Sequence, residues 1–178
     1  LETSSLKGKR FGVFKNLMDI PDYVHFINIL RSQGAEVFEM DSQNGALKGF
    51  LTLLNMDMKS DLPAYLSTFA SSEIVFRNIE DIIRFNVDDL PVRAPYGQSL
   101  FEGIVQDTTS ATSFNKIKTD LENTGKTFFN DLFNKNKLNA VLSINNMHAA
   151  IAAVAKYPCL TIPMGYKDDG EPHGITLI

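Results

Sequence analysis

A run of four residues that could contact a small molecule joins an expected strand to an expected helix. The strand ends near residue 144, and an alanine-rich helix follows from about residue 149. Open α/β sheets place ligand contacts at such junctions, where two side-chain amides could hydrogen-bond a substrate. One of the asparagines could instead cap the helix, a frequent role for that residue. Both roles stay open, and the candidate substrate-binding residues are Asn145, Asn146, Met147 and His148.

The other side chains with reactive groups predict neither a metal site nor a catalytic residue in this chain. The three histidines are far apart and lack the paired spacing of metal ligands. We expect His25 on a helix face and His173 in a loop after Pro172. Cys159 stands at the start of an apolar strand, where a cysteine usually acts as a small hydrophobic residue. The sequence therefore predicts no cofactor and no metal, and it assigns no catalytic residue.

Composition and charge exclude several classes of partner. Hydrophobic residues make up 44% of the 178 residues and charged residues 21%, a balance typical of a globular protein. The net charge is -4 and the basic residues are scattered, so nucleic acid is not an expected partner. No apolar run is long enough to cross a bilayer, so no membrane partner is expected. A single cysteine rules out an internal disulfide framework, which fits a reducing compartment, and we expect the cytoplasm.

The first forty residues have the pattern of a strand, a helix and a second strand. Residues 11–14 and 37–40 are the expected strands. Between them, apolar residues at i, i+3, i+4 and i+7 from Tyr23 predict a helix that begins near Pro21 and ends before Gly34. This order predicts a parallel strand pair with a right-handed crossover.

The middle of the chain, from about residue 47 to residue 138, is expected to be helical. A stripe of apolar residues at 51–69 predicts the first helix. Pro63 has no N–H to donate, so we expect a break near Ser60 and Asp61, with Asp61 capping a new helix.

Two further helices are expected in the same region. Ser71 or Ser72 could cap a short helix that contains Ile79. Apolar residues at 114–132 predict a longer helix, which Gly125 should weaken because glycine loses the most backbone entropy in a helix.

The last forty residues return to strands, expected at 140–144, 160–163 and 174–178. Lys167–Gly170 has the composition of a tight turn, so the last two strands should form an antiparallel hairpin. The sequence thus predicts an α/β protein in one domain, residues 1–178, with a mixed sheet flanked by helices.

Several of these segments resemble one known family of hydrolases. Residues 138–166 and 170–175 look like the C-terminal signature of the amidase family, although Lys156 stands where glycine is usual. Two upstream segments, Lys59–Leu66 and Tyr96–Gln98, are similar to further elements of that family. The resemblance implies a partial amidase-signature fold: a mixed β-sheet flanked by helices, with a helical middle segment.

The resemblance also implies an activity. Members of the family hydrolyse carboxylic or peptide amides to the acid and ammonia or an amine, by a serine, a cis-serine and a lysine in a Gly/Ser-rich region. No Gly-Gly-Ser-Ser segment occurs in this sequence. We therefore expect a C-terminal fragment of an amidase, inactive alone and able to self-associate, whose partner is a small-molecule or peptide amide. The alternative is a non-catalytic α/β ligand-binding or interaction module on the same scaffold.

Overall fold

The computed structural model describes residues 6–41 and 45–178, which form two compact units. Unit 1 comprises residues 1–47 and 120–178, and unit 2 comprises residues 48–119. The helix α6, Ala111–Asn136, contributes residues to both units. Within the described residues, none of the helices combines the length and apolar character that a bilayer crossing requires.

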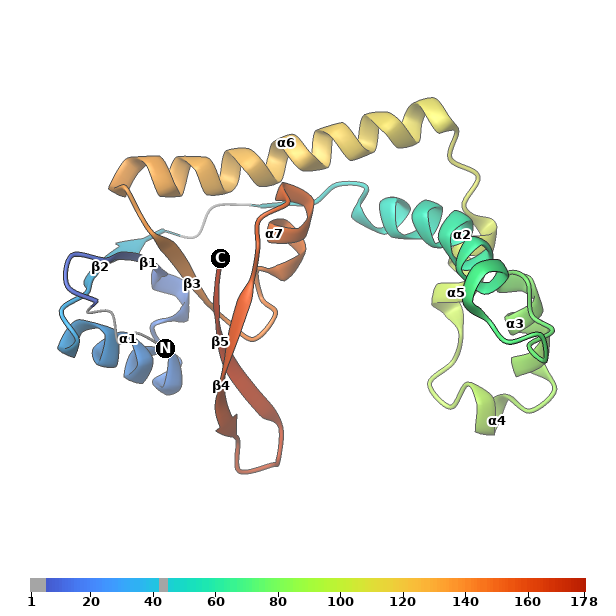
Figure 1. Ribbon diagram of the computed structural model, residues 1–178, viewed down its shortest axis with the longest axis horizontal. Helices are drawn as coiled ribbons and strands as arrows, with labels where there is room; N and C mark the ends of the chain where they lie inside the picture. The colour runs from blue at the N-terminus through green and yellow to red at the C-terminus, as the bar shows by residue number, and fades with distance from the viewer. Residues whose placement is uncertain (1–5, 42–44) are drawn as a thin grey trace. The chain divides into compact units, whose positions relative to one another are not determined.

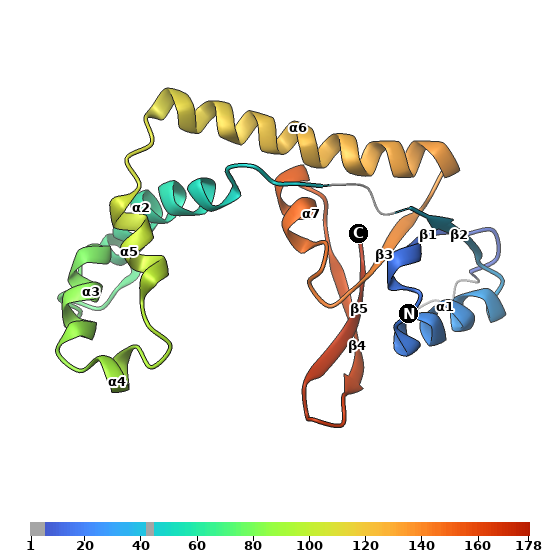
Figure 2. The ribbon, with the colours of Figure 1, turned by 180° about the vertical axis from the view of Figure 1, so that it is seen from behind.

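Unit 1 contains a five-stranded mixed sheet in the order β2-β1-β3-β5-β4. The strands β1, Arg10–Phe14, and β2, Glu36–Met40, run parallel, as predicted, and β1 is also parallel to β3, Ala140–Ile144. The strand β5, Pro172–Leu177, is antiparallel to β3 and to β4, Leu160–Tyr166. The predicted hairpin is therefore confirmed, and its turn extends beyond the other elements of unit 1 (Figure 2).

Helices cover both faces of this sheet. The helix α1, Pro21–Ser32, follows a short 3-10 turn at Lys15–Leu17 and lies on one side, while α7, Ala149–Ala155, and the end of α6 lie on the other (Figure 1). Pro21 occupies the first turn of α1, where its missing N–H costs nothing, and Gly34 beyond the helix has φ 87°. The core side chains with no exposed surface include Val13, Phe14, Tyr23, Ile27, Phe129, Val141, Leu142 and Ile175.

Gly125 has a packing role that the sequence reading missed. A Cβ atom at Gly125 would lie 2.8 Å from the Ala155 nitrogen and 2.8 Å from the Ile151 oxygen. Glycine therefore lets α6 approach the backbone of α7 closely, and the small alanines of α7 serve the same contact. Glycine lowers the helix propensity of α6 at this position, but a larger residue would prevent α6 and α7 from packing so closely.

Unit 2 consists of α2, Phe50–Phe69, α3, Ile79–Val87, α4, Leu90–Arg93, α5, Ser99–Gln106, and the start of α6. The predicted break at Ser60–Asp61 was wrong, because α2 continues through Pro63. Contacts with the C-terminal end of α5 hold the preceding turn: the Lys59 ammonium donates to the carbonyl oxygens of Val105 and Asp107, at 3.1 and 3.0 Å. Lys59 is also exposed, so water can hydrate the carbonyl that Pro63 leaves unbonded.

The cap of α3 also differs from the prediction. Asn78 precedes the helix, and its Oδ1 accepts a hydrogen bond from the Asp81 N–H at 2.9 Å. Ser71 instead accepts a bond from the Glu73 N–H within the preceding loop. Several residues in this region could cap a helix, and the position where the apolar stripe begins to pack decides which one does.

Candidate functional site

Asn145 follows the carboxyl end of β3 and makes three hydrogen bonds with residues of β5. Its backbone is in the left-handed region, with φ 49°, and its N–H donates to the Gly174 oxygen at 2.8 Å. In return the Gly174 N–H donates to Asn145 Oδ1 at 3.0 Å. The Thr176 hydroxyl donates to the Asn145 carbonyl at 2.7 Å. The strand β5 therefore fixes both the backbone and the side-chain amide of this residue.

A row of hydroxyl groups crosses the sheet beside Asn145. Thr176 pairs with Ser143 of β3 on one side and with Thr161 of β4 on the other. The hydroxyl oxygens of Thr161 and Thr176 lie 2.9 Å apart. Because the single proton of Thr176 goes to the Asn145 carbonyl, Thr161 is the donor to Thr176. The sequence reading missed these residues, since only the strand register shows that they are neighbours.

His148 packs against the core rather than standing free in the loop. Its ring stacks on Phe14, with centroids 4.1 Å apart, and its Nδ1 lies 2.7 Å from the Ser143 hydroxyl oxygen. Burial lowers the pKa of His148, so the ring is neutral near pH 7. Ser143 has no exposed surface, so its hydroxyl is not accessible to attack a substrate. The pair can order the loop, and it is not arranged as a nucleophile and base.

The other two predicted residues point toward solvent. Asn146 is exposed and Met147 is 57% exposed. The helix-capping role considered for the asparagines is wrong: His148 is the N-cap of α7, and no side chain accepts a hydrogen bond there. Asn146 bonds Ala149 through its backbone oxygen instead, at 3.0 Å. The four residues do form one loop, whose contact with a substrate stays a prediction.

His173 does not lie in a loop, as predicted, but in β5. Its side chain is only 8% exposed, and its Nδ1 lies 3.1 Å from a carboxylate oxygen of Asp22, in the first turn of α1. The contact joins elements about 150 residues apart, which a local sequence pattern does not reveal. His173 therefore ties the hairpin to α1.

The remaining reactive side chains are dispersed. His25 is exposed on α1, as predicted, and Cys159 is exposed just before β4, the strand at whose start it was expected. Partial burial nonetheless raises the pKa of the Cys159 thiol. Across residues 6–41 and 45–178, no three or more His, Cys, Asp and Glu side chains gather in a way that could hold a metal ion.

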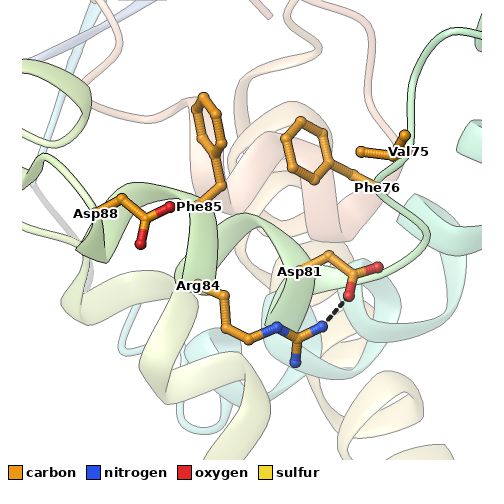
Figure 3. A pocket seen from close by; sticks show the side chains of 6 residues that line it. All are labelled: Val75, Phe76, Asp81, Arg84, Phe85 and Asp88. Carbon is orange, nitrogen blue, oxygen red and sulfur yellow. Dashed lines mark hydrogen bonds and ion pairs between the residues drawn. The ribbon is translucent and has the colours of Figure 1, made fainter.

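A cavity of about 320 Å³ opens on α3 in unit 2 (Figure 3). Phe76 and Phe85 form one wall, in edge-to-face contact with ring centroids 5.1 Å apart. Asp81 on the other wall is paired with Arg84 and accepts a hydrogen bond from the Arg77 N–H. The polar groups that line this cavity thus stabilise the start of α3.

A second cavity in unit 2, of about 390 Å³, lies between α2 and α5. Its lining is mostly apolar and includes Leu54, Met58 and Leu100. Asn55 at its base is used structurally, since its Nδ2 donates to Asp107 at 3.2 Å. Gln98 of the Tyr96–Gln98 segment is likewise buried and accepts a bond from Asn86 at 3.1 Å. The cavity could hold an apolar group.

Comparison with known proteins relates the chain to amidases. No family model matches it. The chain is 30% identical over 191 residues to a probable amidase from Arabidopsis thaliana, and the match covers 99% of this chain and 35% of that protein. It thus spans about a third of the length of the curated relative it matches.

Solved structures show the same relation in the fold. An amidase family protein from Bacillus anthracis matches with a TM-score of 0.81 and 27% identity, over 97% of this chain and 35% of that chain. The peptide amidase from Stenotrophomonas maltophilia matches in fold with a TM-score of 0.77 and 24% identity, over 97% and 39% of the two chains. These matches confirm the resemblance and the mixed sheet expected from the sequence. In sequence and in fold, this chain is therefore related over nearly its whole length to one portion of the amidase-signature proteins.

Proposed function

We propose that this chain is the substrate-side portion of an amidase, an enzyme that hydrolyses a carboxylic or peptide amide to the acid and ammonia or an amine. The observation that carries the proposal is the match to amidases, in both sequence and fold, over nearly the whole chain. The partner is then a small-molecule or peptide amide, and the compartment is the cytoplasm, where the lone Cys159 stays reduced.

In this proposal the loop Asn145–His148 forms part of the wall of the substrate pocket. It lies where β3 ends and α7 begins, and Asn146 and Met147 present exposed side chains there. Rigid support is what a binding loop needs, and Gly174, Thr176 and Phe14 supply it.

The bond-breaking groups of the proposed enzyme lie outside these residues. A serine nucleophile, a bridging cis-serine and a neutral lysine would attack the amide carbonyl, and backbone N–H groups would stabilise the oxyanion. Ser143 is not such a nucleophile, because its hydroxyl is buried against His148. The present chain would supply substrate contacts, and a further polypeptide segment would supply the triad.

The test is an ammonia-release assay on a primary amide and on a C-terminally amidated dipeptide. We expect hydrolysis by a polypeptide that joins this chain to a Gly/Ser-rich segment carrying the triad, and none by this chain alone. Hydrolysis by the isolated chain would show a nucleophile within it and overturn this division of roles. If the longer polypeptide binds an amide without cleaving it, the chain is part of a non-catalytic binding module.

A further inference from the structure

The side-chain amide of Asn145 is held in one orientation. The Gly174 N–H can only donate, so the amide must turn its acceptor, Oδ1, toward Gly174. The Asn145 Nδ2 group then points away from β5. Among residues 6–41 and 45–178 this group has no hydrogen-bond partner. At Asn145 the loop therefore presents a donor and not an acceptor.

This donor is also reachable. Asn145 is half-buried, and within the described part of the chain no buried side-chain nitrogen or oxygen lacks a partner. An unpartnered Nδ2 group must therefore have solvent access. It stands at the carboxyl end of a central strand of an α/β sheet, beside the exposed Asn146 and Met147.

Two hydroxyl groups keep the donor in place. Thr176 donates to the Asn145 carbonyl, and Thr161 donates to Thr176, so the backbone that carries the amide is fixed from β5 and β4. The left-handed φ of 49° costs asparagine less than most other residues. A free donor on a fixed backbone needs little ordering when it binds a ligand.

We propose that Asn145 Nδ2 donates a hydrogen bond to the carbonyl oxygen of an amide substrate, and that Thr176 is the residue that positions it. This inference rests on the proposed function and narrows it, because Asn145 would select a hydrogen-bond acceptor on the substrate. The substrate amide nitrogen, which only donates, is not its partner.

The substitution Asn145→Asp separates these roles. It keeps an oxygen for the Gly174 N–H and replaces the donor by a charged acceptor, so the loop stays in place while the substrate contact is lost. In the amidase that carries this chain, we expect kcat/KM for a primary amide to fall about tenfold or more, because the oxygen that accepts this bond also carries the negative charge of the transition state. Asn139→Asp is the matched control. Asn139 Oδ1 also accepts from a backbone N–H, that of Arg10 at 2.9 Å, at the opposite end of β3. Its kcat/KM should equal that of the unchanged protein.

Thr176 is tested by a pair of variants. Thr176→Val removes the hydroxyl and frees the Asn145 carbonyl, which should lower kcat/KM, whereas Thr176→Ser keeps the hydroxyl and should restore it. A general loss of folding would lower the unfolding temperature as well. Equal kcat/KM values for Thr176→Val and Thr176→Ser would remove Thr176 from the proposal.

A binding measurement keeps this inference distinct from the proposed function. Titration of acetamide into the isotopically labelled chain should shift the Asn145 side-chain NH₂ resonances, and those of Asn139 should stay in place. A shift without hydrolysis in the longer polypeptide would overturn the amidase proposal and leave the donor role standing. Hydrolysis with a normal kcat/KM in Asn145→Asp, and no shift of the Asn145 NH₂ resonances, would overturn the donor role.

Discussion

Tyr23 joins α1 to the centre of the sheet by a hydroxyl group with no exposed surface. The hydroxyl donates to the Leu142 oxygen at 2.7 Å and accepts from the Phe14 N–H at 3.1 Å. Burial raises the pKa of Tyr23, so the phenol stays protonated across the physiological range. One side chain thus bridges the end of β1 and the middle of β3, the strand that leads to the candidate loop.

Removing this hydroxyl should destabilise unit 1. In Tyr23→Phe the ring remains, but two buried backbone groups lose a partner, and we expect the free energy of unfolding to fall by about 1–3 kcal/mol. Tyr65→Phe, at a site 58% exposed in α2, should change it by less than about 0.5 kcal/mol. Urea titration monitored by circular dichroism measures both. Equal effects of the two variants would show that the Tyr23 bonds add nothing to stability.

His148 should make stability depend on pH. Burial lowers the pKa of His148 in the folded protein below its usual value of about 6.5, so near pH 6 the unfolded chain binds more protons than the folded one. The contribution of this residue is therefore fully present above about pH 6.5, and it is lost as the pH falls below that value toward the folded pKa.

The comparison of wild type with His148→Phe tests this dependence. The variant keeps an aromatic ring against Phe14 and has no titrating group. Between pH 7 and pH 5, its free energy of unfolding should fall less than that of the wild type. The Ser143 hydroxyl loses its partner in the variant at every pH. The titration of His148 is therefore measured by the difference between the two proteins in how their free energy of unfolding changes with pH. Parallel curves of unfolding free energy against pH would show that His148 has the same pKa in the folded and unfolded states.

At the scale of elements, two glycines in helices have opposite consequences. Gly125 of α6 lies against the backbone of α7, whereas a Cβ atom at Gly103 of α5 would meet nothing within 4 Å. Alanine favours a helix over glycine by about 1 kcal/mol at either position. Only at Gly125 would the added methyl group clash with α7, and such overpacking costs about 1–3 kcal/mol of stability, which opposes the gain in helix preference.

We therefore expect Gly103→Ala to stabilise the protein by about 0.5–1 kcal/mol and Gly125→Ala to destabilise it by up to about 2 kcal/mol. Thermal unfolding of the two variants beside the wild type provides the measurement. If both variants gain stability, the backbones of α6 and α7 do not approach each other as closely at Gly125 as in the structure.

At the scale of the whole molecule, the sheet of unit 1 ends in a strand with little cover. The strand β4 forms one edge of the sheet, and all but one of its seven residues are exposed. Leu160 is 63% exposed, Ile162 38% and Tyr166 76%. An edge strand with exposed apolar side chains is a template for pairing with another chain. We therefore expect the isolated chain to self-associate through β4.

A charge on this edge should weaken the association. Ile162→Lys would place like charges close together when two edges meet, and we expect at least about tenfold weaker self-association, measured by light scattering over a range of concentrations. Val92→Lys adds the same charge at a residue 74% exposed in unit 2 and should have no such effect. A chain that is strictly monomeric before any substitution would contradict the role of β4.

The sequence by itself determined the elements whose signals are local. These are the helix from Pro21, the parallel strands β1 and β2 on either side of it, and the hairpin turn at Lys167–Gly170. Each follows from periodicity or turn composition within a few residues, and each was predicted with nearly the observed bounds. The family resemblance was also local, since it rests on short motifs. Lys156, in place of the usual glycine, adopts a left-handed φ of 61°, which accounts for the glycine preference at that helix end.

Tertiary structure alone decided how these elements support the candidate loop. The partners of Asn145 lie 29 and 31 residues away, and Asp22 and His173 meet from opposite ends of the chain. For the same reason the break at Pro63 was wrongly predicted and the packing of Gly125 against α7 was missed. Their local preferences oppose the helix, and long-range contacts outweigh those preferences. Such contacts depend on strand register and helix packing, which no short window of sequence specifies.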